Sequence, residues 1–110
     1  MPNGAQYHMS RGMDVLFADR MLQKLETGGD AAAQWSPGIV RAFRKTVHVV
    51  RQAVDERDLR NLKSLHFEKL KGKRSHQHSM RLNDQYRLVV ELSRERARKQ
   101  VTVISIEDYH

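Results

Sequence analysis

The chain has 110 residues, 39% of them hydrophobic, and its 20 Lys and Arg against 13 Asp and Glu leave a formal net charge of +7. This length predicts one domain with a modest core, and the absence of cysteine excludes disulfides, a thiolate nucleophile and cysteine-bound zinc. No apolar run reaches the roughly 18 residues of a membrane span and no signal peptide is evident, so we expect a cytoplasmic protein without membrane contacts.

The N-terminal part of the chain predicts a leader, a strand and a helix. Residues 1–12 have no periodicity and are expected to be a flexible leader, so that a single domain covers residues 13–110. Residues 13–17 are expected to form a short strand. Asp19 can cap a helix that follows, and the glycine at Gly28 is a stop signal for it.

The strongest helix of the sequence is predicted to begin at Ser36 and Pro37. Serine can accept from the free N–H groups of a first turn, and proline at the first helical position loses no hydrogen bond. The apolar residues that follow recur at spacings of three and four and so line one stripe, made of Ile39, Phe43, Val47, Val50 and Val54. The remaining positions are largely basic. Leu59, Leu62 and Leu65 predict one or two further helical turns.

After Gly72 the hydrophobic period changes to two, which is typical of strands. Residues 79–82 and residues 86–92 alternate in this way on either side of a turn at Asn83 and Asp84. We therefore expect a hairpin here.

The C-terminal part predicts one more strand and completes the fold class. Residues 93–99 are highly charged and are expected to be a connection, whereas residues 101–106 are β-branched and apolar on both sides, which suits an inner strand. The element order predicts an α+β fold, in which an N-terminal strand and two to three helices pack on one face of a small antiparallel sheet.

The positive charge is concentrated in one segment. Between Arg60 and Arg87 there are eight basic and two acidic side chains, so this segment holds six of the seven net charges. Such a field favours a polyanion, most often nucleic acid. A solvated basic surface without a partner is the alternative.

Two stretches resemble a known family. The segment FEKLKGKRSHQHSMRLNDQYRLVVEL, residues 67–92, and the closing IEDYH, residues 106–110, are similar to the RelE/ParE toxin superfamily, and within it to the HigB-type toxins of type II toxin–antitoxin systems. The resemblance covers roughly residues 13–110 and implies a RelE-like fold.

The resemblance also implies an activity and partners. The expected activity is ribosome-dependent cleavage of messenger RNA, in which a ribose 2′-hydroxyl attacks the adjacent phosphate without a metal or other cofactor. The expected partners are the ribosome, messenger RNA and a HigA-like antitoxin with a helix-turn-helix domain, and operator DNA is expected only through the complex with that antitoxin.

Five residues are expected in the catalytic centre. Arg87 matches an arginine that the family uses near the scissile phosphate, and a guanidinium stays charged and makes bidentate phosphate contacts; its alternative is an ion pair with Glu91. Asp108, Tyr109 and His110 end the chain with side chains suited to proton transfer and stacking, with a frayed terminus as the alternative.

The fifth catalytic candidate is His66. In the HigB branch a histidine precedes the Leu-Lys-Gly step and is implicated in the active site; the alternative for His66 is the end of a helix. Further residues are expected to bind RNA, namely Lys71, Lys73, Arg74, Arg81 and Tyr86. For the four cations a solvated surface is the alternative, and Tyr86 is also in phase with the core-facing positions of its strand.

Two other functions share parts of this pattern. A ParE-type inhibitor of DNA gyrase would have the same fold without the RNA-cleaving residues, and a non-catalytic RNA-binding module would have the same charge. His76 and His78 could chelate a metal from one strand face, but no third ligand is near them in the sequence, so no metal is expected.

Overall fold

The computed structural model describes residues 12–28 and 33–108 of the chain. Its elements in chain order are β1 (Asp14–Phe17), α2 (Arg20–Thr27), α3 (Pro37–Gln52), α4 (Glu56–Asn61), the 3-10 helix η2 (Lys63–Leu65), β2 (Glu68–Lys69), the 3-10 helix η3 (Gly72–Arg74), β3 (Gln77–Arg81), β4 (Tyr86–Glu95) and β5 (Arg98–Asp108). The predicted leader lies outside the described residues except for Gly12. The predicted α+β class is confirmed.

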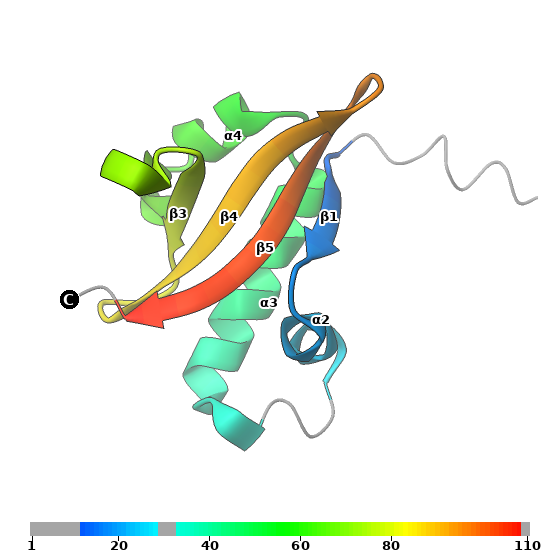
Figure 1. Ribbon diagram of the computed structural model, residues 1–110. Coiled ribbons are helices and arrows are strands. Elements are labelled where there is room, and N and C mark those ends of the chain that lie inside the picture. The colour runs from blue at the N-terminus through cyan, green and yellow to red at the C-terminus, as the bar shows by residue number, and fades with distance from the viewer. Residues whose placement is uncertain (1–11, 29–32, 109–110) are drawn as a thin grey trace, which may run out of the picture.

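The strands form one sheet in the order β1-β5-β4-β3-β2, with α3 lying across one face (Figure 1). The pairs from β2 to β5 are antiparallel, as expected. β1, however, pairs with β5 in parallel, with Val15 opposite Val101, so the sheet is mixed. Strands that pair in parallel need a long crossover between them, and here all the helices lie between β1 and β5.

The predicted helix starts are confirmed. The Asp19 carboxylate accepts a hydrogen bond from the Met21 backbone N–H at 2.6 Å, and the Ser36 hydroxyl accepts from the Ile39 N–H at 3.3 Å. α2 ends at Gly28, whose φ of 111° is a conformation that side chains with a Cβ rarely adopt.

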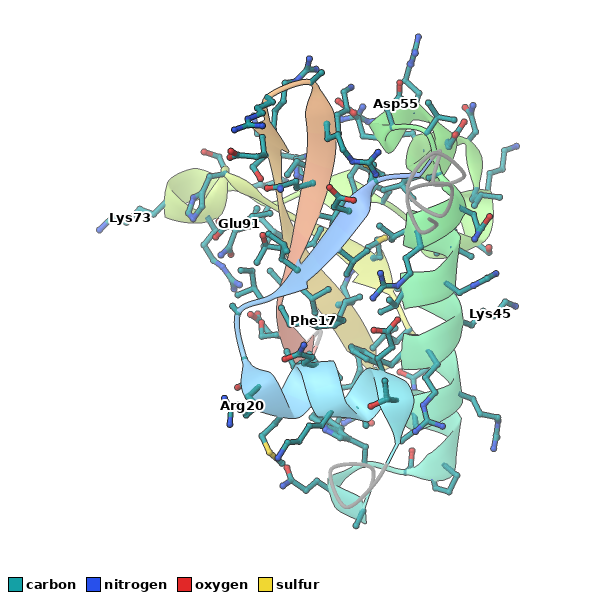
Figure 2. All side chains as sticks on the ribbon, turned by 90° about the vertical axis from the view of Figure 1, so that its right-hand side faces the viewer. Phe17, Arg20, Lys45, Asp55, Lys73 and Glu91 are labelled. Carbon is teal, nitrogen blue, oxygen red and sulfur yellow. The ribbon has the colours of Figure 1, made fainter. Side chains whose placement is uncertain are left out.

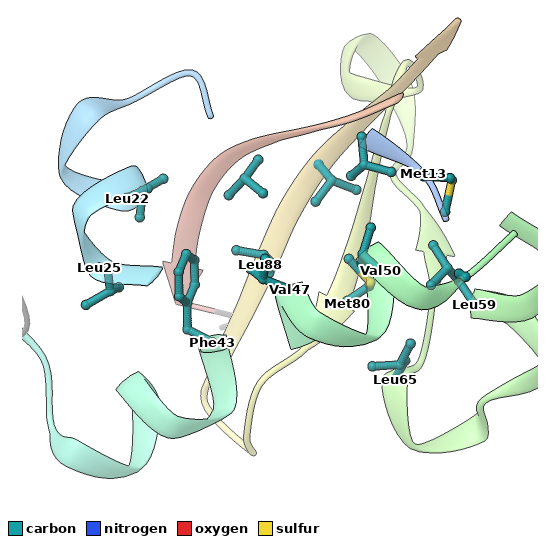
Figure 3. Packing of buried hydrophobic residues seen from close by; sticks show 14 of the residues in the cluster. Met13, Leu22, Leu25, Phe43, Val47, Val50, Leu59, Leu65, Met80 and Leu88 are labelled. Carbon is teal, nitrogen blue, oxygen red and sulfur yellow. The ribbon is translucent and has the colours of Figure 1, made fainter. Parts of the chain in front are cut away.

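The core lies between α3 and the sheet (Figure 3). The α3 stripe supplies Phe43, Val47 and Val50, all almost fully buried. The prediction was wrong for Val54, which is 61% exposed. The helix ends at Gln52, because the chain turns there and the Val54 backbone N–H donates instead to the Asp58 carboxylate at 2.8 Å.

The charged segment from Ser93 to Lys99 is not a loop, contrary to expectation. β4 and β5 continue through it as a paired ladder, and only Arg96 and Ala97 form the turn, with Arg96 at a φ of 58°. Ion pairs hold this end: Arg98 makes two hydrogen bonds with the Asp14 carboxylate, and Lys99 contacts Glu56 at 2.9 Å. Cross-strand pairing and these bonds outweigh the low strand propensity of the charged residues.

The predicted turns after α3 exist as α4 and η2, and they bury Leu59 and Leu65 but leave Leu62 43% exposed. The short edge strand β2 was not predicted. In the described part of the chain, no helix has the length and apolar character that crossing a membrane requires.

Candidate active site

The face of the sheet opposite α3 is polar. Figure 2 shows Glu91 and Lys73 on one side of the sheet and Lys45 on the other, where it projects from α3. Antiparallel partners point to the same face, so the register brings Ser79 beside Glu68 on one side and Val89 on the other. Strands β2 to β5 therefore build one continuous surface.

A pocket of about 300 Å³ opens on this face near the start of β4 and the end of β5. Its lining consists of Glu68, Lys69, Leu70, Lys71, Arg74, Ser79, Arg87, Val89, Glu107 and Asp108. The lining thus combines four cationic and three acidic side chains. Cations at this density favour a phosphate group, and carboxylates beside them can exchange protons with a bound molecule.

Arg87 is the most buried charged residue of the pocket, at 7% exposed. Its guanidinium donates to the Ser79 hydroxyl at 2.9 Å, to the His66 backbone carbonyl at 2.7 Å and to the Glu68 carboxylate at 3.1 Å. The alternative partner, Glu91, does not bind it; Glu91 accepts instead from the Gln77 amide at 3.0 Å. Three contacts from three elements fix the guanidinium plane at the pocket wall.

Arg74 is the second guanidinium of the pocket. It binds the Glu107 carboxylate through both terminal nitrogens, at 2.9 and 2.7 Å, and its Nε donates to the buried Gln77 side chain at 2.9 Å. Arg74 and the Ser105 hydroxyl lower the pKa of Glu107, although burial acts in the opposite direction. Both members of the pair are therefore charged at neutral pH. Their two parallel hydrogen bonds hold the Arg74 side chain against β5.

The segment from His66 to Glu68 closes the pocket on the side of β2. His66 ends η2 in the left-handed conformation, with φ of 47°, and this turn aims its carbonyl at Arg87. Phe67, which lies between His66 and Glu68 in the chain, stacks its ring on the His78 ring with 4.8 Å between the ring centroids. The Arg60 guanidinium lies 5.4 Å from the centroid of the Phe67 ring. These ring contacts anchor the segment to β3.

The His78 ring is the β3 partner in this stacking contact. Its Nδ1 is buried without a hydrogen-bond partner among the described residues. Burial lowers the pKa of His78, and the nearby Arg60 and Lys69 charges act in the same direction, so the ring is neutral at pH 7. His76 lies elsewhere, 3.6 Å from Glu91, and the described residues contain no group of three metal-ligating side chains.

The structure brings together four of the predicted site residues: Lys71, Arg74, Arg87 and Asp108 all line the pocket. Lys73 lies next to them on η3 but is exposed and does not line it.

Two other predicted residues lie apart from the pocket. Arg81 pairs with Asp84 at the hairpin end, and Tyr86 makes an edge-on contact with Trp35 at 5.7 Å on the helix side of the sheet. The side chain of His66 is exposed, and only its backbone contacts the pocket. Tyr109 and His110 lie outside the described residues.

Sequence reasoning missed four polar residues of the pocket, namely Glu68, Lys69, Ser79 and Glu107. Glu68 carried no signal because β2 has only two residues, too few for a visible alternation. For Ser79 the alternation along β3 did indicate a face, but only the tertiary structure shows that Ser79 meets Arg87 and that Glu107 meets Arg74.

Comparisons with known proteins agree with this architecture. A family model described as a RelE-like toxin of the type II toxin–antitoxin system HigB matches residues 15–110. No curated protein sequence matches the chain significantly.

Among solved structures, a YoeB/ParE toxin from Agrobacterium tumefaciens is 15% identical, with a TM-score of 0.57 over 89% of this chain and 100% of that chain. The YoeB–YefM complex from Staphylococcus aureus is 16% identical, with the same TM-score over 89% of this chain and 97% of that one. The YoeB dimer from Staphylococcus aureus is 17% identical and has a TM-score of 0.52, again over 89% and 97%. At these identities the likeness to solved structures concerns the fold.

Proposed function

Because the chain belongs to the HigB-like family of RelE-like toxins from type II toxin–antitoxin systems, we propose that it is an endoribonuclease that cuts messenger RNA on the ribosome. The observation that carries this proposal is the pocket that Arg87, Arg74 and Lys71 line together with Glu68, Glu107 and Asp108. The family match does not favour a gyrase inhibitor of the ParE type. The proposed partners are a HigA-like antitoxin with a helix-turn-helix domain, the ribosome and messenger RNA.

The proposed reaction is an internal transfer. The ribose 2′-oxygen bonds to the adjacent phosphorus, and the bond from phosphorus to the 5′-oxygen of the next nucleotide breaks. The products are a cyclic 2′,3′-phosphate and a free 5′-hydroxyl. A base must take the 2′ proton, an acid must protonate the leaving oxygen, and fixed cations must stabilise the charge that grows on the phosphorane.

We assign the cationic role to Arg87, with Arg74 and Lys71 holding the neighbouring backbone. A phosphate would replace Glu68 at the Arg87 guanidinium, which requires little energy because the Glu68 side chain is 57% exposed and its ion pair is screened by water. The displaced Glu68 carboxylate then lies beside the bound nucleotide as a candidate base. Asp108, Tyr109 and His110 remain the proposed groups for orientation, stacking and proton donation.

Expression of the chain in bacteria is expected to produce new messenger RNA ends that carry a 5′-hydroxyl. Ends of this kind enter a sequencing library only after treatment with polynucleotide kinase, so libraries prepared with and without the kinase identify them. Tyr109→Phe and His110→Ala are expected to remove most of these ends, and Arg94→Ala, an exposed residue of β4, is expected to leave them. Cleavage that persists in both C-terminal variants would contradict the assignment of the last residues.

His66→Asn is expected to retain cleavage within about threefold of the parent. The structural contribution of His66 is a backbone carbonyl presented from a left-handed turn, and asparagine adopts that conformation more readily than most residues. The rate of cleavage of a defined messenger on purified ribosomes measures this. A loss of a hundredfold or more would instead support the sequence-based prediction that the imidazole itself takes part.

A further inference from the structure

A second hollow shares no lining residue with the proposed active-site pocket. It has a volume of about 440 Å³ and lies between one side of α3, η2 and the end of β3. We call it the α3 groove. Its lining consists of Ala42, Lys45, Thr46, Val49, Leu62, Ser64, Leu65, Arg81, Leu82 and Asn83. The proposed RNA chemistry uses none of the hydrophobic residues in this set.

The floor of the groove is apolar and accessible. Leu62 is part of its lining and has 43% of its surface exposed. Val49 and Leu82 are partly buried beside it. An accessible leucine on a concave apolar surface is typical of a site that receives a hydrophobic side chain of a partner.

The charge of the groove is positive. No acidic side chain lines it within the described residues, and Lys45, which projects outward from α3 (Figure 2), has no carboxylate partner there. Arg81 at the far end pairs with Asp84. The partner that complements this surface has apolar side chains on one face and carboxylates at its margin.

We propose that the α3 groove receives an acidic amphipathic segment of the cognate antitoxin, in a contact that uses none of the residues lining the active-site pocket. The inference rests on membership in a toxin–antitoxin family and does not depend on the ribonuclease mechanism. A second copy of the chain fits less well, because each copy carries a net charge of +7. Ribosomal RNA fits less well because a phosphate backbone gains little from an apolar floor.

The rest of the described surface offers one comparable position, which serves as a matched control. Leu16 on the edge strand β1 is 45% exposed and lines another hollow, but that hollow also contains Glu26, which forms an ion pair with Arg51 at 2.8 Å. It therefore presents an exposed leucine of the same size in a hollow whose lining, unlike that of the α3 groove, includes an acidic side chain.

The test measures the dissociation constant between the full-length chain and the purified full-length cognate antitoxin. Leu62→Asp places a carboxylate where we expect an acidic partner, so the dissociation constant should rise at least about tenfold from lost apolar contact and repulsion. Lys45→Glu should also weaken binding and should reduce its dependence on salt. Leu16→Asp should change binding by less than about twofold.

Several outcomes would overturn the proposal. Unchanged affinity in both groove variants would do so, as would an equal loss in Leu16→Asp. Self-association or ribosome binding that Leu62→Asp abolishes while antitoxin affinity stays unchanged would assign the groove to a second copy or to RNA. Because the readout is binding alone, a failure to find 5′-hydroxyl ends would reject the ribonuclease proposal and leave this result standing.

Discussion

Arg87→Ala is expected to slow RNA cleavage by about 100- to 1000-fold. This is the usual effect of removing one fixed hydrogen-bond donor that stabilises the charge developing in the transition state. The residue is buried, and Ser79, His66 and Glu68 hold its guanidinium in a fixed orientation. Arg87→Lys keeps a charge but loses the planar fork, and we expect it to recover less than a tenth of the parent rate. Single-turnover cleavage of a messenger on purified ribosomes measures both.

The control for this prediction is Arg94→Ala, because Arg94 lies on the same strand but is exposed and outside the pocket. Its rate should stay within twofold of the parent. Thermal unfolding of Arg87→Ala separates catalysis from folding: losing these hydrogen bonds should lower stability by about 2 kcal/mol, which leaves a domain of this size folded. A folded Arg87→Ala protein that cleaves at the parent rate would remove Arg87 from the mechanism.

Phe43→Ala is expected to lower the free energy of unfolding by about 4 kcal/mol, the middle of the range for a buried phenylalanine. Phe43 is 0% exposed, and its ring lies 6.4 Å from that of Phe17, so it joins α3 to β1 within the core. Figure 3 shows it beside Leu25 in the buried cluster. The cavity left by alanine cannot close without moving the helix against the sheet. Urea denaturation followed by circular dichroism measures the change.

Val54→Ala is the matched control for the stability prediction. Val54 continues the same sequence spacing as Phe43, Val47 and Val50, but it lies beyond the helix and is 61% exposed. Its loss should change stability by less than about 0.5 kcal/mol. Equal effects of the two substitutions would mean that the helix continues past Gln52 and packs as the sequence pattern predicted.

The helices were predictable because their signals are local. Asp19 and Ser36 cap through hydrogen bonds to backbone groups two or three residues away, and the α3 stripe arises from its own period. The loop predicted over residues 93–99 was wrong because the structure there depends on distant partners. The charged segment from Ser93 to Lys99 forms strand because Asp14 and Glu56, far away in the chain, bind Arg98 and Lys99.

The sequence by itself determined the α+β class, the helix starts, the alternation of the strands and the family, because each depends on residue type at short spacing. It also pointed to Arg87, Arg74, Lys71 and Asp108 as members of a site. Only the tertiary structure decided that these four line one pocket, that Glu68 and Glu107 belong with them, and that Tyr86 lies on the other face. The physical reason is strand register: side chains alternate between faces at every residue, so which groups meet depends on how separate strands align.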